Sequence, residues 1–527
     1  MTAGVPQEAA LTAGSPFGDR MVLQRQKEIR VWGGGRPGGT VEICLADDDP
    51  IRTTITPDGT WSASLPPHEA ARGLSLVLTD EHTRIEFADV AIGEVWVAGG
   101  QSNMEYFLAF DGDRRGILNG PPNPDIRYFD CPRISYEGQL EEKDYSRFGF
   151  WRTSTSDDLP YFSAVGYYFA ADLQASLGVP VGIVGCNWGG TPASAWTSEE
   201  CLESGDGRIW LDEYRAALQG VDLDLASSAY RADPLNDTTD PLKRTLLTLL
   251  LSPGLPRLAQ KALIAAAGRR LKPPTIGPFH PYRPAGLYEL MLKRIAPYAT
   301  RGVIWYQGES DVTHPDIYAQ VFGSMVRCWR ALWCDEVPFL FVQLAPFGEW
   351  LTAKGETYPA LRHQQQIAAD TIPNTWMASS SDAGLQWDIH PKRKASIGRR
   401  LALLARHHIY GQSVEADPPR FSSARRIREG VEVRFDNADG LRLDRGKVPL
   451  VVRSSSGRAV AVRGLRVEGD RLIVTGGFPP RSVFSFAWTG YYHVPLVNGE
   501  GNPATPFRFQ LASVDRPALR RLDSDTN

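Results

Sequence analysis

A serine in a glycine-rich turn lies in the segment of this chain best suited to covalent chemistry. Ser102 follows an apolar run at 95–98 and the pair Gly99-Gly100. A buried strand that ends in two glycines lets the backbone turn sharply and leaves the next hydroxyl at the carboxyl edge of a sheet, where open α/β sheets bind ligands. We interpret Ser102 as a nucleophile rather than a helix N-cap, because a cap does not explain the glycines before it. Since position 104 is Met, the pattern is not the G-x-S-x-G nucleophile elbow.

A serine hydroxyl is a poor nucleophile unless a base lies beside it. The preferred base is His390, in Trp-Asp-Ile-His-Pro at 387–391. His407-His408 precede Gly411 at a predicted helix end, which fits capping better than chemistry. His314 is a lesser rival, because it follows a Gln-Gly-Glu cluster.

An acid must orient the base and stabilise the imidazolium that forms during the reaction. Asp388 is the preferred acid, because it lies two residues before His390 and can share its loop. Asp382 in Ser-Asp-Ala-Gly is the competitor, and a dyad helped by a backbone carbonyl is the third alternative. The Asp388 assignment requires 387–390 to form a loop, since residues two apart on a helix point in different directions.

Two more polar, glycine-containing clusters lie between the serine and the histidine, at 187–191 and 305–311. Together with their flanks, the four clusters read GEVWVAGGQSNME (93–105), VPVGIVGCNWGGTPASAW (179–196), GVIWYQGESD (302–311) and DIHPKRKASIGRRLALLA (388–405). On these strings the sequence resembles the SGNH-hydrolase superfamily, and within it the sialate O-acetylesterase-like carbohydrate esterases. Weaker likeness covers 16–25 and 490–509, so the resemblance extends over most of the chain except roughly 200–284.

The resemblance implies a carbohydrate O-acetylesterase that forms a serine acyl-enzyme and needs no cofactor. Acetylated sialic acids are the expected substrates, so the expected partner is an acetylated carbohydrate. One alternative is an esterase for acetylated xylan or another plant polysaccharide. An alternative of another class is a non-catalytic carbohydrate-binding protein that uses its flanking β-rich regions.

The resemblance also assigns an oxyanion hole to the amides of Ser102 and Gly190 and to the side chain of Gln307. A glycine amide can approach an oxyanion because no side chain blocks it, and a glutamine offers a neutral donor. Turn structure is the alternative reading of these positions. In the superfamily the acid usually lies three residues before the histidine, where this chain has Trp387. The further expected substrate-binding or supporting residues are Gln101, Asn103, Trp188, Glu309 and Arg362.

Two of these residues have competing interpretations. Glu309 either holds the Gln307 loop or binds a substrate hydroxyl. Arg362 either meets a sugar carboxylate or is a solvated helix arginine.

The pattern of apolar and turn residues predicts an α/β chain with a doubly wound parallel sheet, and the resemblance implies that this sheet is SGNH-hydrolase-like. Short alternating stretches between Gly- and Pro-rich turns predict an N-terminal β-sandwich over 1–92 and a C-terminal β-rich region over 414–527. The catalytic domain is expected over 93–200 and 285–413, interrupted by a mostly helical insertion at 201–284. This insertion is either a substrate cover or a packing or dimer element.

Within the catalytic domain, strands are expected at 179–185, 302–306 and 338–345. Helices are expected at 163–177, 359–370 and 390–406.

Bulk properties exclude some functions and leave others open. A net charge of −4 at pH 7 gives no electrostatic reason to expect nucleic acid or an anionic membrane as partner. The six cysteines show no close metal-type pairing, and no metal cluster is apparent. No signal peptide is visible at 1–15 and no apolar run reaches the ~18 residues of a spanning helix. We expect a cytoplasmic protein or an exported one without its leader, of undetermined oligomeric state.

Overall fold

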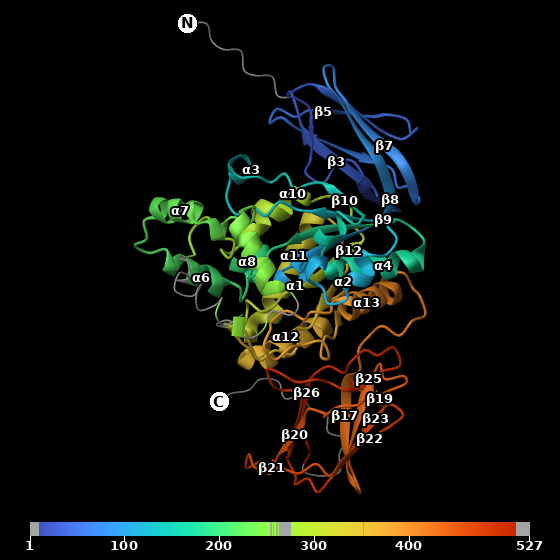
Figure 1. Ribbon diagram of the computed structural model, residues 1–527, viewed down its shortest axis with the longest axis vertical. Helices are drawn as coiled ribbons and strands as arrows, with labels where there is room; N and C mark the ends of the chain where they lie inside the picture. The colour runs from blue at the N-terminus through green and yellow to red at the C-terminus, as the bar shows by residue number, and fades with distance from the viewer. Residues whose placement is uncertain are drawn as a thin grey trace.

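The computed structural model describes residues 10–252, 256, 258–259, 262, 276–350 and 353–512. Three parts follow one another along the long axis of the molecule: an N-terminal β part, a central α/β body and a C-terminal β part (Figure 1). Helices α6 and α7 project from one side of the central body, whereas α8 lies against it (Figure 1). The prediction of a mixed α/β chain with β-rich ends is therefore confirmed.

The central body is built on a sheet in the order β10-β9-β11-β8-β12-β13-β16. All neighbouring pairs in this series are parallel except the edge pair β10–β9. The strands are β8 (Arg84–Gly100), β9 (Asn123–Asp130), β10 (Trp151–Ser154), β11 (Val181–Asn187), β12 (Gly302–Tyr306), β13 (Phe339–Val342) and β16 (Thr375–Ala378).

Helices cover both faces of this sheet, which is why its strands are almost continuously apolar. On one face α4 (Ala164–Leu177) packs against α13 (Ala395–Leu404), and on the other α11 (Tyr318–Trp333) packs against α12 (Tyr358–Thr371). Alternate residues of β8 point into the two resulting cores, with Val97 in one and Trp96 in the other. The remaining helices are α1 (Ser102–Glu105), α2 (Arg114–Leu118), α3 (Gln139–Glu142), α5 (Glu199–Glu203), α6 (Arg208–Ala217), α7 (Leu223–Ala232), α8 (Pro241–Leu251) and α10 (Lys293–Ile295).

Strand β8 belongs to two regions at once. Its first half pairs with β7 (Ala71–Thr79) of the N-terminal part, and its second half lies between β11 and β12. Where the two halves meet, the buried Glu94 carboxylate forms ion pairs with Arg25 at 2.5 Å and Arg301 at 2.8 Å. The N-terminal sheet is therefore hydrogen-bonded into the central one.

The two β-rich ends consist of short strands. The N-terminal strands are β1 (Thr12–Ala13), β2 (Val22–Gln24), β3 (Ile29–Gly34), β4 (Thr40–Leu45), β5 (Ile51–Thr54) and β6 (Thr60–Leu65), with β7. The C-terminal part has two four-stranded sheets, β17-β18-β23-β22 and β21-β20-β24-β26, around a shared apolar core. Its strands are β17 (Arg420–Ile427), β18 (Gly430–Asp436), β19 (Arg442–Leu443), β20 (Leu450–Arg453), β21 (Ala459–Val460), β22 (Gly464–Glu468), β23 (Arg471–Thr475), β24 (Val483–Phe486), β25 (Leu496–Val497) and β26 (Phe507–Gln510).

One predicted helix starts later than expected. The sequence predicts a helix over 390–406, whereas α13 begins at Ala395. The preceding residues use their backbone groups elsewhere: His390 N donates to Asp388 Oδ1 and Lys394 N donates to Asp111 Oδ2. These bonds hold the segment as a loop, which is the condition that the Asp388 assignment requires.

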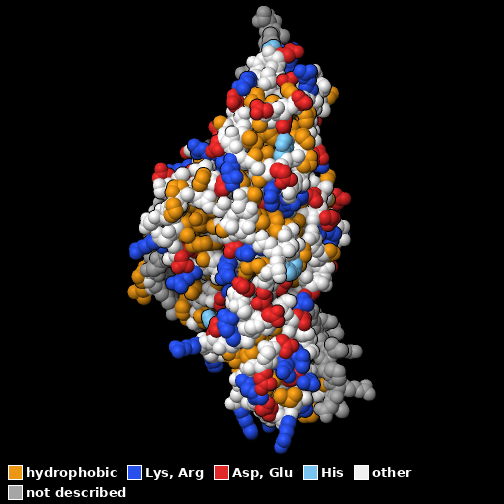
Figure 2. Space-filling model, turned by 90° about the vertical axis from the view of Figure 1, so that its right-hand side faces the viewer, with side chains coloured by type: hydrophobic (Ala, Val, Ile, Leu, Met, Phe, Trp, Pro, Cys, Tyr) orange, Lys and Arg blue, Asp and Glu red, His pale blue; other side chains and the backbone are white. Residues whose placement is uncertain are grey.

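The insertion is mostly helical from α5 to α8, whereas its last described residues, 276–284, form turns and loops. The basic stretch predicted to be helical after Pro253 lies largely outside the described residues. Acidic and basic side chains alternate along the face shown in Figure 2, and Lys and Arg side chains project at the end formed by the C-terminal part. Among the described helices, none has both the length and the apolar character needed to cross a bilayer.

Candidate active site

Ser102 is the first residue of α1 and directly follows the central strand β8. The turn between strand and helix depends on Gly100, whose φ is +131°. A Cβ at this position would lie 2.3 Å from the carbonyl oxygen of Tyr306 on β12, so no larger residue fits. The turn leaves Ser102 half-buried at the carboxyl edge of the sheet.

The structure brings His390 and Asp388 together with Ser102. His390 Nε2 lies 3.0 Å from Ser102 Oγ, and His390 Nδ1 lies 3.2 Å from Asp388 Oδ1. The same Asp388 oxygen accepts the backbone N–H of His390 at 2.9 Å. A tight turn, closed by a β-bridge between Leu385 and Asp388, sets the carboxylate behind the imidazole. With Nδ1–H donated to Asp388, the lone pair of Nε2 faces the serine.

The electrostatics of this pair favour a neutral imidazole. Burial lowers the pKa of His390 below its ordinary value of 6.5, although the Asp388 carboxylate opposes this shift. Burial also disfavours the Asp388 carboxylate, but His390 and Lys392 outweigh it and hold the pKa of Asp388 below 3.8. At neutral pH the site therefore pairs a neutral base with an ionised acid, the protonation states that proton abstraction from serine requires.

Lys392 connects the acid to the helical insertion. Its Nζ lies 2.8 Å from Asp388 Oδ2 and donates to the carbonyl oxygen of Leu251, at the end of α8, at 3.0 Å. The Tyr106 hydroxyl donates to the same carbonyl at 3.0 Å. The insertion thus docks on the acid side of the site through the free carbonyl at a helix C-terminus.

A buried polar network joins three of the motif loops. Asn103 Nδ2 donates to Glu309 Oε1 at 2.5 Å and to the Ile389 carbonyl at 3.1 Å, and Asn103 Oδ1 accepts from Lys394 Nζ at 2.5 Å. Burial raises the pKa of Glu309 and lowers the pKa of Lys394 to about 7. Because Asn103 holds the carbonyl just before His390, this network supports the loop that carries the base.

The 188–190 loop lies against Ser102. A Cβ at Gly189 would approach Ser102 Cβ to 3.3 Å, and Gly189 N donates to Glu105 Oε2 at 2.6 Å. Gly190 has a φ of +81°, and a Cβ there would lie 2.0 Å from the hydroxyl of Tyr282. Within the described residues no acceptor engages the Gly190 N–H. Trp188, expected in the cleft, is buried.

Gln307 does not lie as the resemblance implies. Its fully buried amide nitrogen donates to the Thr191 carbonyl at 3.2 Å and to the Asp311 carboxylate, so both of its hydrogens have acceptors. Its Oε1 accepts from Tyr318 at 3.2 Å. In this structure the side chain ties the 191 and 311 loops together, which differs from the arrangement that the resemblance implies, and its role as an oxyanion donor stays a prediction. Gln101 supports the same region, because its Oε1 accepts the N–H groups of Gly308 and Ser310 at 3.3 Å each.

Arg362 is neither a sugar-binding nor a solvated residue. It is fully buried, and its guanidinium donates to the carbonyls of Leu344, Ala345, Thr489 and Gly490 at 2.8–3.0 Å. It thus ties the segment after β13 to the C-terminal part. Burial lowers its pKa.

The competing acid and bases are engaged elsewhere. Asp382 forms two 2.7 Å hydrogen bonds with Arg400. His314 pairs with Glu213 on α6 at 2.8 Å. The sequence analysis missed Lys392, Lys394 and Tyr282. The first two belong to the quoted DIHPKRK string, whereas Tyr282 lies in the insertion, where nothing in the spacing indicates a role.

Comparisons with known proteins show which proteins the chain resembles. A family model described as carbohydrate esterase, sialic acid-specific acetylesterase, matches residues 270–406. The crystal structure of a carbohydrate acetylesterase from Xanthomonas citri is similar with a TM-score of 0.72 and 27% identity, over 95% of this chain and 99% of that one. Over nearly its whole length, the chain is thus similar to a carbohydrate esterase.

The curated relatives that the chain resembles are sialate O-acetylesterases. Sialate O-acetylesterase of Mus musculus is 25% identical over 436 residues, which cover 74% of this chain and 72% of the mouse protein. The Homo sapiens protein of the same name is 25% identical over 425 residues, covering 74% and 70%. The resemblance to sialate O-acetylesterases stated from the motifs is confirmed.

Proposed function

We propose that this protein is a carbohydrate O-acetylesterase of the SGNH-hydrolase type that removes O-acetyl groups from sialic acids. The observation that carries the proposal is the array of Asp388, His390 and Ser102, linked at 3.2 Å and 3.0 Å. The likeness to sialate O-acetylesterases supports the substrate class.

In the proposed mechanism His390 Nε2 takes the proton of Ser102 while Oγ attacks the acetyl carbonyl. Asp388 holds the tautomer and stabilises the imidazolium. The backbone amides of Ser102 and Gly190 are the proposed donors to the oxyanion. His390 then returns the proton to the sugar oxygen as it leaves. In the second half-reaction it activates the water that releases acetate.

The sugar carboxylate requires a cation, and Arg362 is excluded from that role. We assign it to Lys243 on α8. Burial lowers the pKa of Lys243, and its charge interacts with Glu105, which holds the 188–190 loop. Burial, with a smaller contribution from the same charge, lowers the pKa of His280 to about 4. Glu105 is the last residue of α1, which begins at Ser102, and this shared helix is the ground for proposing Lys243 as the cation.

Two measurements test the function and the substrate class separately. Acetate release from acetylated sialic acids, acetylated xylo-oligosaccharides and p-nitrophenyl acetate is compared for the wild type, Ser102→Ala and, as a control, Ser204→Ala. Ser102→Ala is expected to lower kcat by roughly 10⁶-fold on every substrate, while Ser204→Ala, at an exposed position, leaves it unchanged. Retention of more than a few per cent of activity by Ser102→Ala would refute the mechanism in which Ser102 is the nucleophile.

Lys243→Met tests the substrate assignment. It is expected to raise KM for the acetylated sialic acid at least tenfold, because an ion pair to the carboxylate is lost, and to leave p-nitrophenyl acetate unaffected. Equal KM changes on both substrates would refute recognition of the carboxylate by Lys243. Faster turnover of the xylo-oligosaccharide would favour the plant-polysaccharide alternative.

A further inference from the structure

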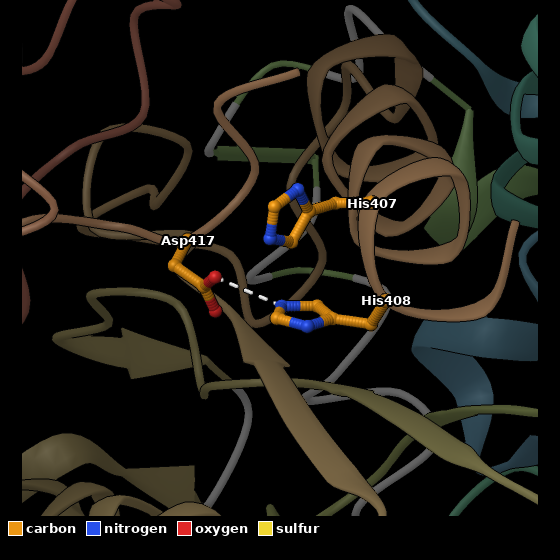
Figure 3. Close-up of side chains that lie close together, drawn as sticks. All are labelled: His407, His408 and Asp417. Carbon is orange, nitrogen blue, oxygen red and sulfur yellow. Dashed lines mark hydrogen bonds and ion pairs between the residues drawn. The ribbon is translucent and has the colours of Figure 1, made fainter. Parts of the chain in front are cut away.

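A group of metal-ligating side chains lies away from the proposed active site. His407 and His408 belong to a π-helical turn, Ala405–Ile409, that follows α13, and Asp417 lies in the segment leading to β17. One ligand atom from each residue lies within 4.8 Å of the other two. Figure 3 shows both imidazole rings turned toward the Asp417 carboxylate. The sequence analysis interpreted the histidines as caps and found no metal cluster, because this grouping depends on the fold.

The rings of the two neighbouring histidines lie close together although they follow one another in a helical turn. In a regular α-helix successive side chains point about 100° apart. Here the two ring centroids lie only 4.6 Å apart, with the rings nearly perpendicular at 88°. His408 also stacks on Trp376, with centroids 4.5 Å apart and planes 16° apart, which fixes its ring.

A hydrogen bond prepares the His407 imidazole as a ligand, and another holds His408 against Asp417. His407 Nδ1 lies 3.3 Å from the Gln412 carbonyl oxygen, an acceptor, so Nδ1 carries the proton and the lone pair is on Nε2. A backbone carbonyl that orients a histidine in this way is typical of metal sites. His408 Nε2 lies 2.8 Å from Asp417 Oδ2. The nearby Arg406 is neutralised by Asp172 at 3.1 Å, so its charge does not repel a cation.

We propose that His407, His408 and Asp417 bind a divalent transition-metal ion, with Zn²⁺ the best match. Two imidazoles and one carboxylate suit Zn²⁺ rather than Mg²⁺ or Ca²⁺, which prefer oxygen ligands. Ligand atoms around a tetrahedral Zn²⁺ are about 3.3 Å apart, so the half-exposed Asp417 and the exposed His407 need to move only slightly. Binding displaces the His408 proton shared with Asp417.

The proposed ion joins the catalytic body to the C-terminal part. The Lys394 end of α13 lies near the proposed active site. Because α13 has ten residues, the cluster at its other end lies roughly 15 Å away along the helix. The role is therefore structural: the ion fixes the chain between α13 and β17 and takes no part in ester hydrolysis.

The experiment titrates chelator-treated full-length protein with Zn²⁺ by calorimetry and measures the melting temperature with and without the ion. One equivalent is expected to bind and to raise the melting temperature by about 3 °C or more. His407→Gln and Asp417→Asn are each expected to weaken binding by more than about 10–100-fold. Two matched controls, the exposed-site variant His82→Gln and the active-site variant His390→Gln, should bind as the wild type does.

Co²⁺ gives a readout that does not depend on stability. Wild-type protein is expected to show a visible ligand-field band with Co²⁺ that is lost in His407→Gln. The proposal is overturned if the wild type binds no Zn²⁺, if His407→Gln and Asp417→Asn bind it like the wild type, or if only His390→Gln abolishes binding. These outcomes do not involve esterase activity, so they are separable from the proposed function.

Discussion

Replacing Asp388 by Asn tests the proposed acid with an almost isosteric change. In the wild type Asp388 Oδ1 accepts two N–H groups of His390, while Oδ2 faces the Lys392 ammonium at 2.8 Å. An asparagine has one oxygen for these three donors. If the oxygen faces Lys392, the new NH₂ group faces His390 Nδ1, which must then accept. The proton moves to Nε2 and points at Ser102, so the base is blocked.

The wrong tautomer in such an array costs about 10⁴ in kcat, or about 5.4 kcal/mol of transition-state stabilisation. In the alternative orientation the amide oxygen faces His390 and the amide NH₂ faces the Lys392 ammonium. This second orientation places two donor groups against each other, so its electrostatic cost makes the inactive orientation the preferred one. The double variant Asp388→Asn/Lys392→Met removes the ammonium, so the amide oxygen can turn to His390 without this cost. It is therefore expected to regain at least tenfold of the lost activity.

The assay is kcat for p-nitrophenyl acetate hydrolysis at pH 8, with the melting temperature recorded for each variant. Asp382→Asn is the matched control. Because Asp382 forms its two hydrogen bonds with Arg400, this change should lower the melting temperature while kcat stays within about threefold. A loss of less than tenfold in Asp388→Asn would show that His390 works in a dyad. A larger loss in Asp382→Asn would refute the assignment of the acid.

Four further predictions concern the neighbouring groups. The positive charge of Lys392 contributes to lowering the pKa of His390. Lys392→Met should therefore move the acid limb of the kcat/KM profile to higher pH. An acid limb at the same or a lower pH would contradict the effect of Lys392 on His390. Activity should fall only as the pH drops through the lowered pKa of His390, below 6.5, and a wild-type limb above 6.5 would show that burial does not dominate. Gln307→Ala should lower kcat by less than about tenfold and destabilise the fold by about 1–3 kcal/mol, because Asp311 loses a buried donor. A kcat loss of 10²–10³ would instead support Gln307 as an oxyanion donor. EDTA should leave kcat unchanged in His407→Gln, which lacks the proposed structural site, and a loss in that variant that Zn²⁺ reverses would overturn the serine mechanism.

The sequence indicates the site well where local pattern decides it. Gly-rich polar clusters at the ends of buried parallel strands must meet at one edge of the sheet. The sequence places Ser102 at such an edge, and the resemblance groups it with Gly190 and Gln307. The strand at 302–306 was predicted with its observed bounds.

The errors concern side chains whose partners are distant in sequence. Arg362 has two of its four acceptors more than 120 residues away, in the 489–490 segment. No pattern within its own helix distinguishes it from a solvated arginine. Gln307 shows the same limit, because the Thr191 carbonyl that occupies its amide belongs to another loop. The roles of Ser102, His390 and Gly190 in catalysis stay predictions.

The passage of β8 through two sheets limits how this molecule can be divided. Removal of the segment before Arg84 would strip β2 and β7 from the first half of β8 and leave its backbone N–H and C=O groups without partners. Such an exposed strand edge is a template for association between chains. Arg25 would be lost with it, leaving the buried Glu94 with less neutralising charge. The minimal catalytic unit is therefore set by strand pairing, and it includes the N-terminal sheet even though no residue of that sheet approaches Ser102 in the described contacts.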